Sequence, residues 1–377
     1  MPAAEFGRCV VSLRSEALGR GISGPTFDTA LAGVEPDPSV LEAMDAQPEF
    51  KTPIGDYLAV LVDEERIADG RANLERWASV LDQVEGRYGV DRHFVVAVWG
   101  VESDFGRQMG GRPLVRSLAT GACEGRRQKF FRDELMATLR ILQSGDMPLE
   151  ALRGSWAGAF GQTQFMPTTY QRLAVDFDGD GKRDIVGSVP DALGSTANFL
   201  VKAGWASGEP WGYEVRLPAG YAGPSGRRNR QALTQWRARG VTAVDGQPLG
   251  GSGSAALLLP AGTNGPAFLV FGNFNALYAY NAAESYALAI AHLSDRLRGG
   301  TAFKAAWPTD DAGLSRAQRR ELQVLLNQRG FDVGEPDGAI GPRTRAAIRA
   351  FRLSIGLSVD ERAGKRVFEA LKSLPAQ

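Results

Sequence analysis

The chain up to about residue 200 carries apolar and polar positions in long mixed segments that are typical of helices. A helix also needs a start, and Asp91 is expected to provide one, because its carboxylate can accept hydrogen bonds from the free amides of a first helical turn. The pattern predicts a mainly helical N-terminal part, with helices over Gly70 to Tyr88, Asp91 to Glu102, Arg126 to Gln143 and Pro190 to Ala203.

The pattern changes between residues 209 and 273, where Gly and Pro are frequent and the apolar runs are short. Such runs predict short strands joined by turns, here at Tyr213 to Leu217, Ala256 to Leu259 and Phe268 to Phe271. A helical pattern returns at Asn281 to Leu297, so the strand-rich part is interpreted as an insertion. The predicted fold class is mainly α with a small β insertion (α+β).

A Gly-rich stretch follows at residues 299–313 and has the composition of a linker. From Leu314 onward, roughly 60 residues show their own apolar periodicity, which is enough for a small and marginally stable helical domain. We therefore predict a domain over residues 1–300, a linker over residues 301–313 and a second domain over residues 314–377.

The 43 basic and 43 acidic residues leave no net charge, so the composition argues against a general affinity for nucleic acid. It excludes little else. No apolar stretch is long enough to span a bilayer, and the first residues lack the design of an export signal, so either the protein is cytosolic or its signal has been removed. Cys9 and Cys123 fit two buried thiols or one disulfide equally well. His93 and His292 are too few for a His-rich metal site.

The first candidate for chemistry is Glu102, which follows the apolar run from Phe94 to Trp99. A carboxylate among buried residues keeps its proton near neutral pH, so Glu102 is a candidate catalytic acid. A helix end whose charged residues face water explains the same pattern. Periodicity alone favours this second interpretation.

A second candidate is the segment Ser155 to Pro167, which combines glycines with polar and aromatic residues. Glycines allow a ligand to approach the backbone closely, and Ser155 or Gln164 would then bind a polar substrate beside Trp156 and Phe165. A tight helix contact explains the segment about as well.

Three motifs, Gly100 to Gly106, Ser155 to Pro167 and Tyr280-Asn281, resemble the B family of lytic murein transglycosylases in the same order. The resemblance covers roughly residues 5–300 and implies a lysozyme-like helical core with a small inserted β-subdomain. It also implies an enzyme that cleaves the β-1,4 bond between N-acetylmuramic acid and N-acetylglucosamine without water and leaves a 1,6-anhydro ring. A hydrolytic muramidase and a non-catalytic wall-binding scaffold are the alternatives.

The resemblance assigns roles to single residues. Glu102 becomes the one general acid and base, since the substrate supplies its own nucleophile and no second carboxylate is needed. Asp104 points elsewhere on a helix and is a poor second carboxylate. Ala283 stands where a serine is expected, which puts one local contact in question. The expected substrate contacts are Ser155, Gln164, Tyr280, Phe165 and Asn281.

An acidic loop begins at Asp176 and resembles the start of a calcium loop, with oxygen ligands at alternate positions around glycines. Position twelve is Gly187 instead of Glu, so Asp184 or Asp191 must complete the shell, and related transglycosylases favour Asp191. The expected role is structural, with Ca²⁺ preferred over Mg²⁺; the alternative is a solvated turn without an ion. The predicted ligands are Asp176, Asp178, Asp180, the carbonyl of Lys182 and Asp191.

The C-terminal unit, with its Asp337-Gly338 and Gly341-Pro342 turns, resembles the three-helix peptidoglycan-binding domain of many wall hydrolases. Family membership implies the periplasm, with outer-membrane association open, and it favours a Cys9–Cys123 disulfide in that oxidising compartment. Glycan strands are the expected partner, with cell-wall synthesis proteins as a second class, and the chain is expected to be a monomer that needs no catalytic cofactor.

Overall fold

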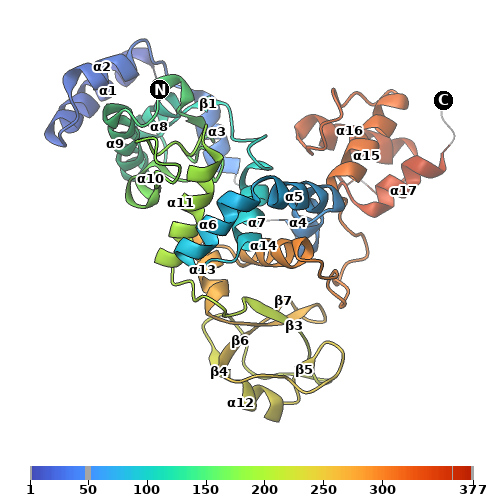
Figure 1. Cartoon of the computed structure of the whole chain (residues 1–377). Helices are drawn as coiled ribbons and strands as arrows, with labels where there is room; N and C mark the ends of the chain where they lie inside the picture. The colour runs from blue at the N-terminus through green and yellow to red at the C-terminus, as the bar shows by residue number, and fades with distance from the viewer. Residues whose placement is uncertain (1, 47–51, 359, 375–377) are drawn as a thin grey trace. The chain divides into compact units, whose positions relative to one another are not determined.

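The computed structural model describes residues 2–46, 52–358 and 360–374. Met1, residues 47–51, Val359 and residues 375–377 belong to the predicted domains but lie outside the described residues. The chain forms two compact units, one from Met1–Lys51 with Asn73–Ser207 and one from Thr52–Ala72 with Gly208–Gln377. Helices dominate and the strands are short, which confirms the predicted fold class (Figure 1).

The described residues of the first unit are mostly helical and include a two-stranded ladder, in which Arg112 pairs with Gly154 and Pro113 with Arg153. This unit includes α7 (Arg92–Ser103), in which every residue from Phe94 to Gly100 is buried. Its elements are α1 (Ala3–Gly19), α2 (Gly24–Leu31), α3 (Pro38–Ala46), α6 (Ala78–Tyr88), α7 (Arg92–Ser103), β1 (Arg112–Pro113), α8 (Leu114–Cys123), α9 (Gln128–Ser144), η2 (Leu149–Ala151), β2 (Arg153–Gly154), α10 (Pro167–Leu173) and α11 (Val189–Lys202).

A disulfide fastens α1 to α8, joining Cys9 and Cys123 with their Cα atoms 5.8 Å apart. The two cysteines are 114 residues apart in sequence, so the bond closes a long loop and restricts the unfolded chain. The predicted disulfide is confirmed.

The second unit holds the inserted sheet and the C-terminal helices. Asp63 precedes α5 and caps it by accepting a hydrogen bond from the backbone amide of Arg66 at 2.8 Å. The elements of this unit are α4 (Ile54–Leu61), α5 (Glu64–Arg76, up to Ala72 in this unit), β3 (Gly212–Arg216), β4 (Arg230–Ala232), α12 (Leu233–Ala238), β5 (Thr242–Ala243), β6 (Ser254–Leu258), β7 (Pro260–Thr263), β8 (Ala267–Val270), α13 (Gly272–Asn281), α14 (Glu284–Leu297), α15 (Arg316–Gln328), α16 (Pro342–Ser354) and α17 (Lys365–Ser373).

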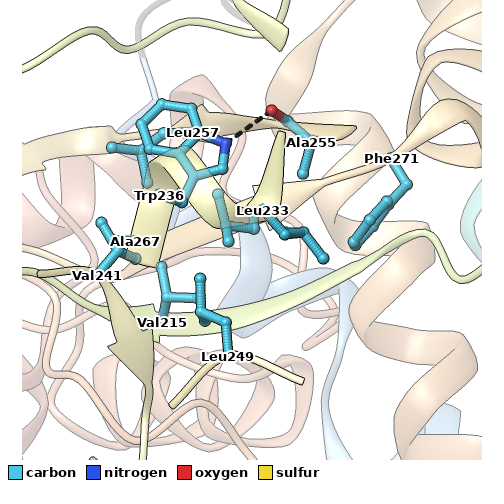
Figure 2. Close-up of a cluster of buried hydrophobic side chains, with 10 residues drawn as sticks. Val215, Leu233, Trp236, Val241, Leu249, Ala255, Leu257, Ala267 and Phe271 are labelled. Atoms are coloured by element: carbon cyan, nitrogen blue, oxygen red, sulfur yellow. Dashed lines mark hydrogen bonds between the residues drawn. The ribbon is translucent and has the colours of Figure 1, made fainter. Parts of the chain in front are cut away.

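The inserted sheet is antiparallel, with five strands in the order β4-β6-β8-β3-β5. One face carries a core around Trp236, whose indole nitrogen donates to the carbonyl of Ala255 at 2.9 Å (Figure 2). Trp236 lies on α12, a short helix that the sequence pattern did not predict. The three predicted strands correspond to β3, β6 and β8, with ends shifted by one or a few residues.

Three of the predicted helices differ from the structure by one or two residues at each end, and the other two differ more. The segment from Gly70 to Tyr88 is broken at Trp77, which has φ −105° and ψ 19° and precedes α6. The helix expected from Asn281 starts at Glu284, because Ala282 has φ 49° and ends α13 in the left-handed conformation. Neither break carries a Gly or Pro, so the sequence offered no signal for it.

The C-terminal helices surround a core that includes Leu322, Ile348 and Phe351. Ser315 starts α15 with a capping box, because its hydroxyl accepts from the amide of Gln318 and the Gln318 side chain accepts from the amide of Ser315. The segment predicted as a linker is bound at its end, where the amide of Lys365 donates to the carbonyl of Ala312 at 2.8 Å. Among the described helices, none is both long and apolar enough to cross a membrane.

Candidate active site

Glu102 lies half-buried in the last turn of α7. Asp91 caps the start of this helix, where its carboxylate accepts from the amide of His93 at 2.8 Å, as predicted. At the other end, the amides of Asp104 and Phe105 donate to the carbonyls of Gly100 and Trp99 at 3.1 and 3.3 Å. The turn that carries Glu102 is therefore closed by hydrogen bonds at its own end.

Three consecutive residues after this turn are left-handed: Asp104 (φ 51°), Phe105 (φ 59°) and Gly106 (φ 83°). The conformation is uncommon for an aromatic residue and folds the Phe105 ring back onto α7. There it meets Trp99 edge to face, with ring centroids 5.5 Å apart, and covers Gly100, where a Cβ would lie 2.7 Å from the ring. Gly100 thus leaves the room that this helix end requires.

Asp104 does not offer a second carboxylate for catalysis next to Glu102. It is 8% exposed and pairs with Arg107 at 3.0 Å. This geometry agrees with its exclusion as a catalytic partner.

The second motif starts with a tight turn at Ser155. The Ser155 hydroxyl accepts from the amide of Ala159 at 3.0 Å, and the Ser155 amide donates to the Ala159 carbonyl at 2.8 Å. A Cβ on the preceding Gly154 would lie 2.1 Å from that carbonyl oxygen, so this position requires glycine. Ser155 itself is half-buried.

Gln164 connects the second motif to the loop that follows Glu102. Its side-chain amide donates to the carbonyl of Met109 at 3.0 Å and to that of Gly161 at 2.8 Å. Its backbone is left-handed, with φ 50°. The β1–β2 ladder pairs residues just after this loop with residues just before the motif, so the structure brings the first two motifs together within the first unit.

Phe165 was predicted to contact substrate, and the structure corrects this. Its side chain is 2% exposed and packs against Phe199, with ring centroids 5.9 Å apart. An apolar ring next to Gln164 is more stable in the core than in a polar groove. Phe165 therefore supports the motif from inside.

Tyr280 and Asn281 end α13 and belong to the second unit. The half-buried Tyr280 ring stacks on Tyr286, with centroids 6.0 Å apart and planes at 20°. Asn281 is exposed. The expectation that Tyr280 lies beside Glu102 stays a prediction.

The acidic loop brings three carboxylates together. Oxygens of Asp176, Asp178 and Asp191 lie within 4.8 Å of one another, and such hard oxygen donors suit a divalent cation. Asp180 does not belong to this group; its carboxylate accepts from the amide of Lys182 at 2.8 Å. The Lys182 carbonyl stays a predicted ligand.

Asp191 anchors this cluster from the start of α11 and is fully buried. It accepts from the amides of Phe177 and Asp184, each at 2.7 Å. Burial raises its pKa, and the neighbouring Asp178 adds to this, so a cation would favour its ionised form. Asp184, the alternative to Asp191, instead accepts from the amide of Gly187 at 2.7 Å.

Both histidines have structural positions. His93 pairs with Asp91 through Nδ1 at 2.8 Å. His292 is 6% exposed and stacks on Phe303, and burial lowers its pKa to about 4, so it is neutral at pH 7. Neither belongs to a group of potential metal ligands among the described residues.

Two residues that tie the site together were not predicted from the sequence. The Ser103 hydroxyl donates to the carbonyl of Gln162, joining the first motif to the second. Ser103 stands next to Glu102 in the first motif. Its burial, at 1% exposed, is the feature that distinguishes it from the other polar residues of that motif. No feature of the sequence pointed to Glu134. Its carboxylate binds the start of α10, where it accepts from the amide of Thr168 at 2.9 Å.

Comparison with known proteins identifies the family of this chain. The family model for the transglycosylase SLT domain matches residues 5–295, and that for a peptidoglycan binding domain matches residues 315–371. The chain therefore belongs to the SLT transglycosylase family, the class of lytic transglycosylases that act on peptidoglycan, and ends in a peptidoglycan-binding domain.

Among individual relatives, the crystal structure of SltB3 from Pseudomonas aeruginosa, in complex with NAG-anhNAM-pentapeptide, is 49% identical and has a TM-score of 0.79; the match covers 98% of this chain and 99% of that one. The Escherichia coli transglycosylase Slt35, in complex with calcium, is 29% identical, with a TM-score of 0.69, over 77% of this chain and 92% of that one. Membrane-bound lytic murein transglycosylase B of Escherichia coli K12 is 33% identical over 270 residues, 68% of this chain and 73% of that protein.

Proposed function

We propose that this protein cleaves the β-1,4 bond between N-acetylmuramic acid and N-acetylglucosamine without water and forms 1,6-anhydromuramoyl products. The observation that carries the proposal is Glu102 on a helix end closed by its own hydrogen bonds, with the nearby Asp104 paired to Arg107. The SltB3 relative was crystallised with NAG-anhNAM-pentapeptide, an anhydro-sugar ligand, and this supports the same product.

In this proposal Glu102 acts alone. It first donates its proton to the oxygen that leaves as the glycosidic bond breaks. Its carboxylate then takes the proton of the muramoyl C6 hydroxyl, whose oxygen bonds to C1 and closes the ring. Proton and electron pairs balance, so Glu102 ends the cycle protonated.

The substrate would be held by residues around Glu102. Ser155 and Gln164 are proposed to line its subsite from the second motif, and Tyr280 and Asn281 from α13. Phe165 would hold Gln164 in place from the core.

The decisive experiment uses Glu102→Gln on purified sacculi, with muropeptides identified by mass spectrometry. We expect the wild type to release anhydro products and the variant to lose about a hundredfold or more of the rate, because glutamine transfers no proton. Asp104→Asn is the matched control and should retain most activity.

Two outcomes would contradict the proposal. Products one water heavier than the anhydro species would indicate a hydrolytic muramidase. Full lysis by Glu102→Gln would remove Glu102 as the catalyst.

For the acidic loop, we propose structural Ca²⁺ held by Asp176, Asp178 and Asp191, with Asp180 and the Lys182 carbonyl as further predicted ligands. The clustered oxygens support this, as does the calcium in the Slt35 relative. We expect Ca²⁺ to raise the melting temperature of the wild type and not that of Asp191→Asn. Asp180→Asn should lose less of the response than Asp191→Asn, because Asp180 lies outside the cluster of carboxylate oxygens; an equal loss in both would place the ion elsewhere in the loop.

We further propose that the protein works in the periplasm, where a Cys9–Cys123 disulfide is stable. The Escherichia coli relative is described as membrane-bound, which supports a location at the cell envelope. Fractionation of cells with an antibody should recover the native protein with the envelope or periplasm. Recovery in the cytosol would contradict this.

A further inference from the structure

A chain of hydrogen bonds leads from the acidic loop toward Glu102, all within the first unit. It begins at Asp191, whose Oδ2 accepts from the amide of Asp184 at 2.7 Å. The Asp184 carboxylate in turn accepts from the amides of Val186 and Gly187 at 2.9 and 2.7 Å. The position of the buried Asp191 therefore fixes the turn from Asp184 to Gly187.

This turn holds Gln162 of the second motif on two sides. The Gln162 amide donates to the carbonyl of Ile185 at 2.9 Å, and its side-chain nitrogen donates to the carbonyl of Val186 at 3.1 Å. Gln162 is 5% exposed, so neither bond competes with bulk water. A shift of the turn would carry Gln162 with it.

Ser103 makes the final step. Its hydroxyl donates to the Gln162 carbonyl and accepts from the amide of Gly106 at 2.8 Å. Ser103 is the last residue of α7 and follows Glu102 directly. This one buried side chain connects the turn that carries Glu102 both to Gln162 and to the left-handed residues after the helix.

We propose that Ser103 is a positioning residue through which a cation bound at the acidic loop fixes the helix end that carries Glu102. Clustered carboxylates repel one another, and a cation removes this repulsion and holds Asp191 in one place. The fixed turn then holds Gln162, and Gln162 holds Ser103. The inference rests on the proposed function of Glu102 and on the proposed cation.

The matched variants are Ser103→Ala and Ser117→Ala. Ser117 is also 1% exposed and lies in the same unit, but its hydroxyl has no hydrogen-bond partner among the described residues. Ser103→Ala removes a hydroxyl with three partners, the carbonyls of Gln162 and Trp99 and the amide of Gly106, and Ser117→Ala removes one with none among the described residues. The pair separates loss of the connection from loss of a buried hydroxyl.

The first measurement is hydrogen–deuterium exchange of the full chain, with Ca²⁺ or with a chelator. All proteins compared carry Glu102→Gln, so that none of them turns over substrate. We expect Ca²⁺ to slow exchange in residues 176–191 and in residues 98–108 when Ser103 is present. With Ser103→Ala, the loop should stay protected and residues 98–108 should no longer respond. With Ser117→Ala, both segments should respond as before.

The second measurement is steady-state turnover of glycan strands. Loss of a buried hydrogen bond of about 1 kcal/mol corresponds to roughly fivefold in rate, so kcat of Ser103→Ala should fall about fivefold to tenfold with KM within twofold. Ser103→Thr keeps the hydroxyl and should recover most of kcat.

The inference is overturned if residues 98–108 respond to Ca²⁺ equally with and without Ser103, or if neither segment responds. It is also overturned if Ser103→Ala abolishes loop protection, since Ser103 then has a merely structural role. Unchanged lysis by Glu102→Gln would defeat the proposed function instead, and the exchange measurement would still decide the connection.

Discussion

Two buried carboxylates in this molecule occupy similar positions and have opposite electrostatics. Asp63 in the second unit and Glu134 in the first are 6% and 4% exposed. Each binds the first turn of a helix: Asp63 accepts from the amide of Arg66 at 2.8 Å, and Glu134 from that of Thr168 at 2.9 Å. Burial raises the pKa of a carboxyl group in both places.

Their remaining partners make the difference. Arg316 donates to Asp63 through Nε at 3.0 Å and through Nη2 at 3.2 Å, and these bonds outweigh burial, so the pKa of Asp63 lies below its ordinary value. Glu134 has the neutral hydroxyl of Thr168 at 2.7 Å, and its pKa lies above its ordinary value because burial prevails. Burial alone therefore does not predict the charge of a carboxyl group; the charge of its hydrogen-bond partner does.

The largest effect is expected from Asp63→Ala. It removes the cap of α5 and leaves the mostly buried guanidinium of Arg316 without its main partner. Breaking a buried ion pair from one side costs about 3–5 kcal/mol, so unfolding of the second unit should occur at clearly lower urea concentration. A loss below about 1 kcal/mol would show that Asp63 and Arg316 do not depend on each other.

Glu134→Ala should have an intermediate effect. It deletes a buried acceptor of two hydrogen bonds at the start of α10, and loss of a helix cap costs about 0.5–2 kcal/mol. Urea unfolding measures the loss of stability. The control is Gln171→Ala, which removes a hydrogen bond elsewhere on the same helix, since the Gln171 side chain donates to the carbonyl of Ala137. Equal losses in both variants would mean that the cap has no special role.

Opposite pH trends give a smaller and sharper contrast. The folded pKa of Asp63 lies below its unfolded value of about 3.9, so its stabilising contribution is present above that value and is lost as pH falls through the folded pKa. The folded pKa of Glu134 lies above its unfolded value of about 4.3, so its contribution is fully present below that value and is lost as pH rises through the folded pKa.

We therefore expect the stability difference between wild type and Asp63→Asn to shrink on acidification below about pH 4. The difference between wild type and Glu134→Gln should shrink as pH rises above about 4.3. Urea unfolding at several pH values between about 3 and 7 measures both. Trends of the same sign would contradict the role given to Arg316.

Local pattern predicted the parts of this molecule that depend on neighbours in sequence. The apolar run of α7, the Asp91 cap and the main strands were predicted from the residues, and the resemblance to a known family predicted the disulfide and the two kinds of domain that the family models match. Neither buried carboxylate was found. Asp63 meets Arg316 across 253 residues, and Glu134 meets Thr168 across 34, and periodicity contains no information on such contacts.

The same limit applies at the candidate site. Glu102, Ser155 and Gln164 were selected because their motifs are recognisable along the sequence. Ser103 received no role, since its partner Gln162 is 59 residues away and the hydrogen bond is to a backbone carbonyl, which any residue carries. Phe165 was placed in the substrate groove because a sequence does not show which side of a turn a ring faces.

The smallest effect is expected from Glu65→Gln, which tests whether exposure or charge decides the strength of the Asp63 pair. Glu65 pairs with Arg320 at 2.6 Å between the same two helices, α5 and α15, but both side chains are more than a third exposed. Water and salt screen such a pair, so the variant should lose about 0.2–1 kcal/mol in low salt and almost nothing in about 0.5 M salt. Asp63→Ala should lose nearly the same stability at both salt concentrations, because its pair is buried. Equal losses of stability in Glu65→Gln and Asp63→Ala would mean that an arginine partner is sufficient for a strong pair and that burial of the pair adds no stability. The contrast between Asp63 and Glu134 would then depend on charge alone.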